Sequence, residues 1–127
     1  MRHLKAEGVK VTATAIYSKT QGFLAIATGV DYLAPYYNRM QSLDIDTRGT
    51  LEALAGFIRR FDAPSKIMAA SFKNVSQVSH ALEAGADAVT LPPKLLRAAL
   101  SAPGIEAAVD AFISDWKKIY GTTSLPD

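Results

Sequence analysis

Four side chains that follow or lie in short apolar runs have the right types to work on a phosphate ester. Arg39 closes the stretch YLAPYYNRM (32–40), and Ser71 closes the next apolar run along the chain. A guanidinium can hold a phosphate through two parallel hydrogen bonds, and a serine hydroxyl with nearby backbone N–H groups can complete such a site. Tyr36 can act as an acid/base group where a cation or a water network lowers its pKa. Thr14 alternates with other inward positions of the first apolar run and offers a further hydroxyl.

Each of these residues also has an ordinary structural role. Arg39 can lie in solvent with its aliphatic stem against Met40 or Tyr37. Tyr36 can be a buried tyrosine whose hydroxyl bonds a backbone carbonyl. Thr14 can be a β-forming residue without any chemical duty. Spacing alone leaves both interpretations open for each residue.

The other reactive side chains give weaker signals. Lys73, in ASFKN, can be an amine nucleophile where it is desolvated, although a lysine after a strand is more often a solvated charge. His3 and His80 have no partner ligands at metal spacing, and Asp44 and Asp46 lie two apart in a loop, which is too weak a pattern for a cation site. The sequence has no cysteine, and GFLAIATG lacks the lysine and spacing of a phosphate-binding glycine loop. We therefore expect no metal site and no cofactor.

These residues need a scaffold, and two alternating hydrophobic patterns describe it. Near-continuous apolar runs rich in Val, Ile and Tyr are typical of strands in a parallel sheet, and stripes at a spacing of three and four residues are typical of helices. The predicted strands are 11–17, 31–37, 66–71 and 87–91. The predicted helices are 2–7, 21–28, 50–61, a segment capped by Ser76 and ended by Gly85, a segment from the prolines 92–93 to 103–104, and 105–119. Such alternation indicates parallel βα units, whose strands end at one common edge where α/β proteins bind ligands.

The composition fits one α/β domain. The 127 residues suffice for a real core, and the charged fraction of 20% is ordinary for a globular protein. A formal net charge of +2 is too small to indicate nucleic acid or an anionic membrane as partner. We find no signal peptide or membrane-spanning run, so we expect a soluble protein of a reducing cytoplasm. Four βα units can form a small open sheet, and they are also half of a (β/α)8 barrel, whose usual length is about 250 residues.

Several motifs in this order resemble the transaldolase family. They are LKAEG, TATAIYSKTQG, YLAPYYNRM, KIMAASFKN, GADAVTLP and FISDWKKIYGTTS, which together extend over nearly the whole chain. The patterns APYxNR, AASFK and DWxxxYGxTS are the most specific of them. The similarity is greatest to the short, fructose-6-phosphate-aldolase-like branch of the family.

This resemblance implies a fold and a chemistry. Members of the family are (β/α)8 barrels that use a lysine Schiff base to cleave and transfer three-carbon units of sugar phosphates. By resemblance, Thr14 would help to hold the catalytic water on strand five, and Tyr36 on strand six would be the acid/base group. Arg39 and Ser71 would bind the substrate phosphate. The chain would then correspond to strands five to eight of the barrel, residues 1–127 forming one half-barrel domain with a C-terminal helix.

The same resemblance implies that one half of the machinery lies elsewhere. In the family the Schiff-base lysine lies on strand four, in a KVPxT-like segment before the LKAEG helix, and we expect strands one to four to be absent from this chain. A half barrel exposes two strand edges, so we expect assembly with a second copy or with a separate N-terminal half. The helix that carries Phe112, Trp116 and Ile119 would add a further contact surface, since in the family it packs on a neighbouring subunit.

Three hypotheses about activity follow. The chain can be part of an aldolase that works only with a lysine-bearing half, or it can be an inactive homologue that binds sugar phosphate or only assembles. In the third, Lys73 or Lys19 has taken over as the amine. We favour an isolated chain that is inactive.

Overall fold

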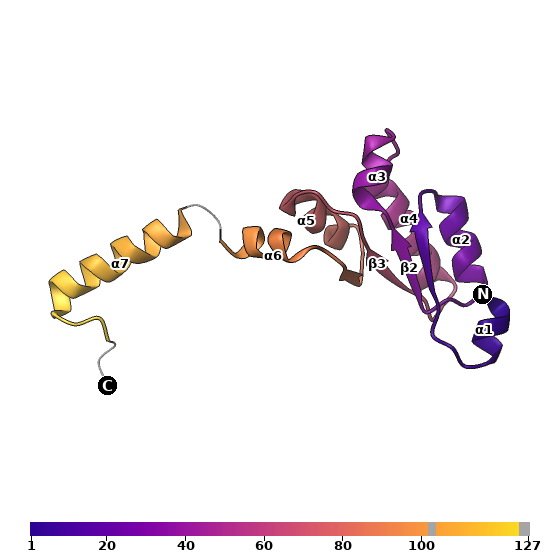
Figure 1. Cartoon of the computed structure of the whole chain (residues 1–127), viewed down its shortest axis with the longest axis horizontal. Coiled ribbons are helices and arrows are strands. Elements are labelled where there is room, and N and C mark those ends of the chain that lie inside the picture. The colour runs from indigo at the N-terminus through magenta and orange to yellow at the C-terminus, as the bar shows by residue number, and fades with distance from the viewer. Residues whose placement is uncertain (102–103, 125–127) are drawn as a thin grey trace.

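A computed structural model describes residues 1–101 and 104–124, and this part of the chain contains seven helices and four strands (Figure 1). The elements in chain order are α1 (Arg2–Ala6), β1 (Thr12–Ile16), α2 (Lys19–Ala27), β2 (Tyr32–Pro35), α3 (Tyr37–Ser42), α4 (Thr47–Arg60), β3 (Lys66–Ala69), α5 (Val75–Glu83), β4 (Ala88–Val89), α6 (Pro93–Leu100) and α7 (Ile105–Tyr120). The alternation of strands and helices that the sequence predicts is confirmed.

The four strands form one parallel sheet in the order β1-β2-β3-β4. Thr12 pairs with Tyr32, Tyr32 with Lys66, and Met68 with Ala88. Consecutive strands are neighbours and are connected through helices, which is the arrangement of successive βα units in a barrel. The fold is therefore four parallel strands alternating with helices, followed by a C-terminal helix, as in part of a (β/α) barrel. β1 and β4 form the two edges.

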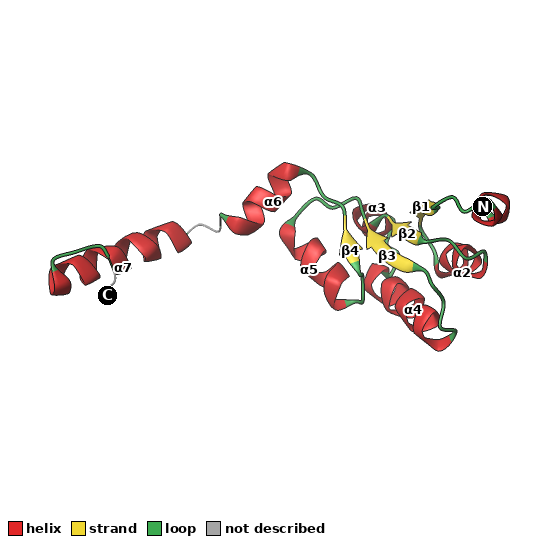
Figure 2. Cartoon of the chain, turned by 90° about the horizontal axis from the view of Figure 1, so that it is seen from below, coloured by secondary structure: helices red, strands yellow, loops and turns green. Residues whose placement is uncertain are grey.

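Helices cover one face of the sheet only. Figure 2 shows α2, α4 and α5 along one side of the strands, and in the described part of the chain no helix lies along the other side. The covered face holds the core, in which Leu33 and Ile67 are fully buried against Ile26 of α2 and Leu54 of α4. This burial of apolar side chains is the main driving force for the fold.

The uncovered face, here called the open face, corresponds to the inside of a barrel. Side chains alternate between the two faces along a strand, so the pairing register assigns them. The open face carries Thr12, Thr14, Tyr32, Ala34, Tyr36, Lys66, Met68, Ala70, Ala88 and Thr90. Most of its members in the middle and at the carboxyl end of the strands are small.

All four strands are shorter than predicted, and the second shows why. Its predicted range reached residue 37, but β2 ends at Pro35 and α3 begins at Tyr37. The backbone N–H groups of Tyr37 and Asn38 donate to the carbonyls of Ala70 and Ser71, at 2.8 and 2.9 Å, and thereby turn the chain over the end of β3. Tyr37 is buried in this turn, whereas Tyr36 before it lies on the open face.

A bulge interrupts β1 on the edge of the sheet. The register with β2 shifts between Thr14 and Ile16, and Ala15 between them has a positive φ of 57°. Bulges of this kind bend a strand and end its regular pairing. The ladder of β1 is therefore regular only at its first residues.

Helix caps explain where the helices begin. Ser18 caps α2 and Asp46 caps α4, each accepting a backbone N–H three residues on. The predicted cap of α5 at Ser76 is wrong, since Asn74 accepts the N–H of Gln77 at 2.9 Å. Asp46 thus has a structural role as the cap of α4. Gly85 follows the last turn of α5 with a φ of 98°, as the stop signal predicts.

The last helix has no buried residue. Figure 1 shows α7 extending away from the sheet, beyond α6. Its ring stack joins Phe112, Trp116 and Tyr120, with centroid distances of 6.4 and 4.3 Å, and Phe112 is 69% exposed. In the described residues, no helix combines the length and the apolar character that crossing a bilayer requires.

An ion pair ties α1 to the start of the sheet and gives a first prediction. The Asp31 carboxylate accepts Lys5 Nζ at 2.7 and 2.8 Å and the Val11 N–H at 2.7 Å. The hydrogen bond from Lys5, with that from Val11, lowers the pKa of Asp31 from 3.8 to about 2. The folded state therefore favours the anion, and this contribution is complete above about pH 4 and is lost as the pH falls through about 2.

We expect Asp31→Asn to lower the free energy of unfolding at neutral pH, because the amide cannot form the ion pair. The difference between the two proteins should shrink as the pH falls from about 4 to about 2, where the wild-type carboxylate becomes protonated. Urea unfolding of both proteins across this range measures it. A difference that stays constant with pH would show that the charge of Asp31 does not stabilise the fold.

Candidate active site

Thr14 and Tyr36 meet at the carboxyl end of the sheet. Thr14 belongs to β1, and Tyr36 follows β2 directly and pairs with Ala70. The Thr14 hydroxyl donates a hydrogen bond to the phenol oxygen of Tyr36 at 3.0 Å. Both side chains lie on the open face, and Tyr36 is half-buried while Thr14 is exposed. The structure thus brings together the two residues for which the sequence predicts a catalytic role.

Arg39 covers the ring of Tyr36. Its guanidinium carbon lies 5.2 Å from the ring centroid, and Nη1 donates to the Tyr17 hydroxyl at 3.2 Å. Tyr17 in turn packs edge-on against Tyr36, with 5.8 Å between centroids. The hydrogen bond to Tyr17 raises the pKa of Arg39 above its ordinary value, so the cation persists throughout the physiological range. Arg39 is therefore a fixed positive charge at the carboxyl end of the sheet, in contact with two tyrosines.

Ser71 also lies at the carboxyl end of the sheet, in the turn after β3. It has a φ of 65°, a left-handed conformation that a residue with a side chain seldom adopts. Its carbonyl accepts the Asn38 N–H, so Ser71 is fixed against the helix that carries Arg39. Within the described residues, no direct hydrogen bond joins Arg39 to Ser71. Their joint role in binding a phosphate stays a prediction.

Tyr17 is a site residue that the sequence did not single out. It comes directly after β1, and its backbone N–H donates to Gln21 Oε1 at 2.8 Å. The same signal that marks Tyr36, a polar aromatic residue where a predicted parallel strand ends, applies to Tyr17 as well. Its hydroxyl is the present partner of Arg39, and together they form one side of a cavity of about 490 Å³ that Ser42 and Leu43 complete.

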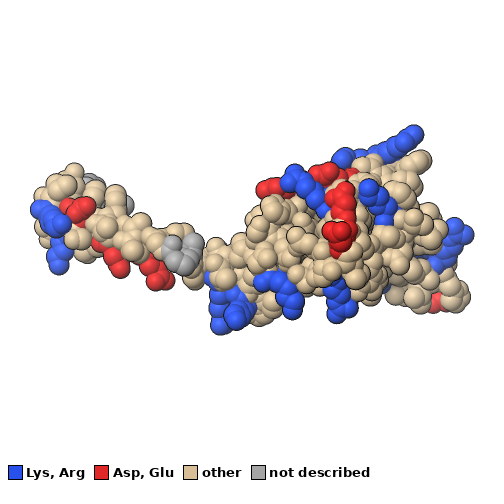
Figure 3. All heavy atoms as spheres, turned by 90° about the horizontal axis from the view of Figure 1, so that it is seen from above, with Lys and Arg blue, Asp and Glu red and all other residues tan. Residues whose placement is uncertain are grey.

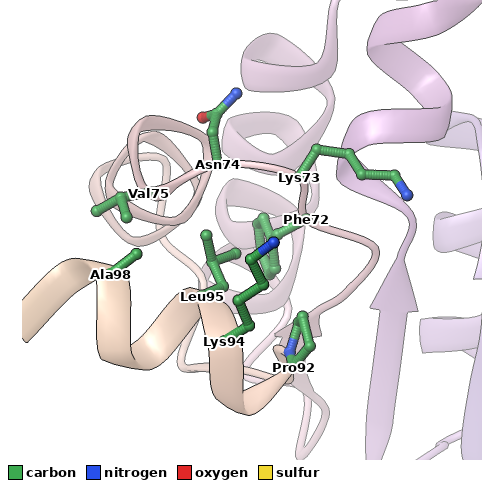
Figure 4. Close-up of a pocket in the computed structure, with 8 residues that line it drawn as sticks. All are labelled: Phe72, Lys73, Asn74, Val75, Pro92, Lys94, Leu95 and Ala98. Atoms are coloured by element: carbon green, nitrogen blue, oxygen red, sulfur yellow. The ribbon is translucent and has the colours of Figure 1, made fainter.

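A second cavity lies between α5 and α6. It has a volume of about 520 Å³, and Figure 4 shows the side chains that form it. Lys94 extends past Phe72 and Leu95, whereas Lys73 points away from them. Lys73 is exposed, which favours the solvated charge over the desolvated amine among the two roles that the sequence leaves open.

Charge and possible metal ligands are spread out. On the face drawn in Figure 3, acidic side chains lie among basic ones over the body of the molecule. Among the described residues, no group of three or more His, Asp and Glu side chains could hold a metal ion. His3 Nε2 lies 3.1 Å from Oε1 of Glu7, the residue after α1, and His80 is exposed.

Comparisons with known proteins show which family the chain is similar to. The profile of the family described as Transaldolase/Fructose-6-phosphate aldolase matches residues 1–123. A curated relative from Streptococcus pneumoniae (strain ATCC 700669 / Spain 23F-1), named as a probable fructose-6-phosphate aldolase, is 52% identical over 125 residues. The alignment covers 98% of this chain and 56% of the relative, and it falls on the relative's C-terminal half. The chain thus spans about half the length of the curated relative that it matches. It belongs to the transaldolase/fructose-6-phosphate aldolase family.

Proposed function

We propose that this chain supplies the phosphate-binding and proton-transfer half of an active site that performs aldolase or transaldolase chemistry on a sugar phosphate. The observation that carries the proposal is the Thr14–Tyr36 hydrogen bond of 3.0 Å beneath the Arg39 guanidinium. A fixed cation next to paired hydroxyls, on the open face of a parallel sheet, suits a substrate that has a phosphate at one end and a carbonyl at the other.

Each residue has a physical part in this chemistry. Arg39 donates to the phosphate through the N–H groups that do not face Tyr17, and the Ser71 hydroxyl adds a further donor. The Tyr36 oxygen already accepts the Thr14 hydrogen, so its own hydrogen is free to point toward substrate or water. Tyr36 therefore exchanges a proton with the reacting carbon or oxygen, and Thr14 orients the phenol and a nearby water. Metal and cofactor play no part in these steps.

The amine for the Schiff base comes from outside the described sheet in this proposal. Among the described residues of the open face, the one lysine is Lys66, which lies at the amino end of β3. Lys66 and Ala70 are four residues apart, about 13 Å along a strand at roughly 3.3 Å per residue. Lys19 and Lys73 are exposed. These placements support a lysine from a partner half, on a strand that precedes the LKAEG helix in the family.

The strand edges support such a partner. A groove of about 520 Å³ follows the whole of β1 and the outer side of α2, where Leu24 is 65% exposed. An added strand and helix would cover backbone groups and apolar surface that are now open to water. A lysine-bearing half suits the open face better than a second copy does. Ala34, Ala70 and Ala88 would face their own equivalents in a two-copy barrel and leave its interior poorly filled.

The uncovered α7 gives assembly a second surface. Its exposed apolar side chains include Ile105, Phe112 and Ile119, a set that a water-soluble helix rarely displays without a partner. We propose that α7 packs on a neighbouring subunit of the assembled protein. The number of subunits follows from light scattering of the assembled form.

Borohydride trapping tests the proposed function. The chain alone and a joined protein, in which the unmatched N-terminal part of the pneumococcal relative precedes residue 1, are each treated with fructose 6-phosphate or dihydroxyacetone and borohydride. We expect a mass increase in the joined protein only, located by peptide mapping in the added part.

Two other outcomes would contradict this proposal. A mass increase on the chain alone would show that one of its own lysines forms the imine, and Lys73→Met and Lys19→Met would identify it. If the joined protein is folded but forms no adduct and cleaves no sugar phosphate, the chain is a homologue that binds sugar phosphate or only assembles.

A further inference from the structure

The buried side chain of Gln77 connects two parts of the proposed anion site. Gln77 is 5% exposed, although it is polar. Its Nε2 donates to Asn38 Oδ1 at 3.0 Å and to Gln41 Oε1 at 2.6 Å, both on α3. Its Oε1 accepts the Lys73 N–H at 2.8 Å, in the loop after β3. One side chain thus holds α3 and the loop together.

These two parts are the ones that carry the predicted phosphate ligands. Arg39 lies on α3 between Asn38 and Gln41, which are three residues apart and so share a helix face. Ser71 lies two residues before Lys73 in the loop. The contacts of Gln77 therefore add to the Asn38–Ser71 backbone hydrogen bond in fixing the position of Arg39 relative to that of Ser71.

Helix α3 needs such an external fixation. It has six residues, and an isolated helix of that length is unstable in water. Two backbone hydrogen bonds hold its first turn, from Tyr37 and Asn38 to the end of β3. Further along, the fully buried Met40 packs in the core, and Gln77 adds a hydrogen bond to Gln41. Without it, the rotation of α3 about its first turn is less restricted, and so is the position of Arg39.

A comparison inside the chain separates this role from simple helix capping. Gln21 has the corresponding place in α2, three residues after the cap Ser18, and its Oε1 accepts the Tyr17 N–H at 2.8 Å. Capping of that kind requires only the side-chain oxygen. Gln21 is exposed, whereas Gln77 is buried and uses its amide nitrogen on a second helix as well. The additional contacts go beyond what the start of α5 requires.

We propose that Gln77 is a positioning residue, which sets the separation of Arg39 and Ser71 for binding a phosphate group. This inference rests on the proposed function, because it concerns the same anion site. Gln77 itself does not touch the substrate. It acts through Asn38 and Gln41 on one side and through the Lys73 backbone on the other.

The test measures binding of inorganic phosphate to the full chain by calorimetric titration, with fructose 6-phosphate as a second probe. We expect Gln77→Met to weaken phosphate binding about tenfold, the order expected when one or two hydrogen bonds are lost. Gln41→Ala, which removes one contact at the exposed side of α3, should give a smaller loss. In Gln77→Glu the amides of Asn38 and Gln41 can rotate to donate to the carboxylate, so the link to α3 is kept. We expect its phosphate affinity to exceed that of Gln77→Met where salt screens the repulsion between the carboxylate and the phosphate.

Asn74→Ala is the matched control. It removes the cap of α5 but leaves the link to α3 in place, so it should lower thermal stability without changing phosphate affinity. Circular dichroism establishes that each variant is folded, and Gln41→Ala replaces Gln77→Met if the latter is not.

The outcomes separate the two proposals. If wild type binds phosphate and Arg39→Ala does not, but folded Gln77→Met and Gln41→Ala bind as wild type does, the role of Gln77 is overturned and the site stands. If wild type shows no binding that depends on Arg39, both the site and the role of Gln77 are overturned. Equal losses of phosphate affinity in Asn74→Ala and Gln77→Met would show that Gln77 acts only through the cap of α5.

Discussion

Replacing Arg39 with alanine is expected to weaken the binding of phosphate by about a hundredfold and to leave the fold intact. A guanidinium that donates two charge-assisted hydrogen bonds to a phosphate contributes roughly 3 kcal/mol, which corresponds to this factor. Arg39 is exposed and its contacts are with the surfaces of Tyr17 and Tyr36, so little packing is lost. Titration calorimetry at two salt concentrations measures the affinity.

Two variants make this prediction specific. Arg39→Lys keeps the charge but not the planar fork, so we expect an intermediate affinity. Arg48→Ala removes an exposed arginine of α4, whose side chain pairs with Glu52 and Glu83, and should leave the affinity unchanged. If Arg48→Ala and Arg39→Ala weaken binding equally, the effect is one of net charge and Arg39 does not bind phosphate directly.

Replacing Tyr36 with phenylalanine in the joined protein is expected to lower kcat by about 100-fold to 10,000-fold, the range of general acid–base catalysis. The change removes the oxygen that accepts the Thr14 hydrogen bond and keeps the ring beneath Arg39. KM should therefore change little, because phosphate binding does not use the phenol. Thr14→Val leaves the phenol but removes its donor, and we expect a loss of about tenfold. Steady-state cleavage of fructose 6-phosphate measures both constants.

Tyr32 provides the matched control for Tyr36. It lies on the open face at the amino end of β2, the strand that Tyr36 follows, and Tyr32→Phe removes a phenol oxygen far from the site. We expect no change in kcat for this variant. A Tyr36→Phe protein with unchanged kcat would remove the proton-transfer role from Tyr36 and point to another group or to water.

Much of the scaffold could be predicted because strands and helices leave different hydrophobic periods. The apolar runs that end near Tyr36 and Ser71 were recognisable as parallel strands, and parallel strands end at one edge. That geometry alone placed Thr14, Tyr36, Arg39 and Ser71 near each other. In the structure, Thr14 and Tyr36 are joined by a hydrogen bond that the sequence pattern did not specify.

Helix α3 could not be predicted, for a physical reason. Its residues YNRMQS have no strong helical pattern, and Tyr37 favours a strand by its own preference. Tertiary contacts decide instead: the carbonyls of Ala70 and Ser71 bind its first N–H groups, and Gln77 binds its side chains. The same limitation hid Tyr17 as the partner of Arg39, because that contact joins residues 22 apart in sequence. The cap of α5 was predicted at Ser76 and not at Asn74, because both are good capping residues and the sequence pattern does not choose between them.

The bulge at Ala15 has a consequence for the proposed partner strand and for access to the site. Because the bulge turns the backbone at Ala15, we expect a partner strand beside β1 to pair regularly from Thr12 to Thr14 and to lose its hydrogen-bond partners at Ala15. Beyond Thr14 we expect the partner strand to diverge from β1, which would leave a wider opening next to the Thr14 and Tyr36 hydroxyls. The left-handed conformation of Ala15 would then limit how far the two strands can pair and would set the width of the opening through which a substrate reaches the site.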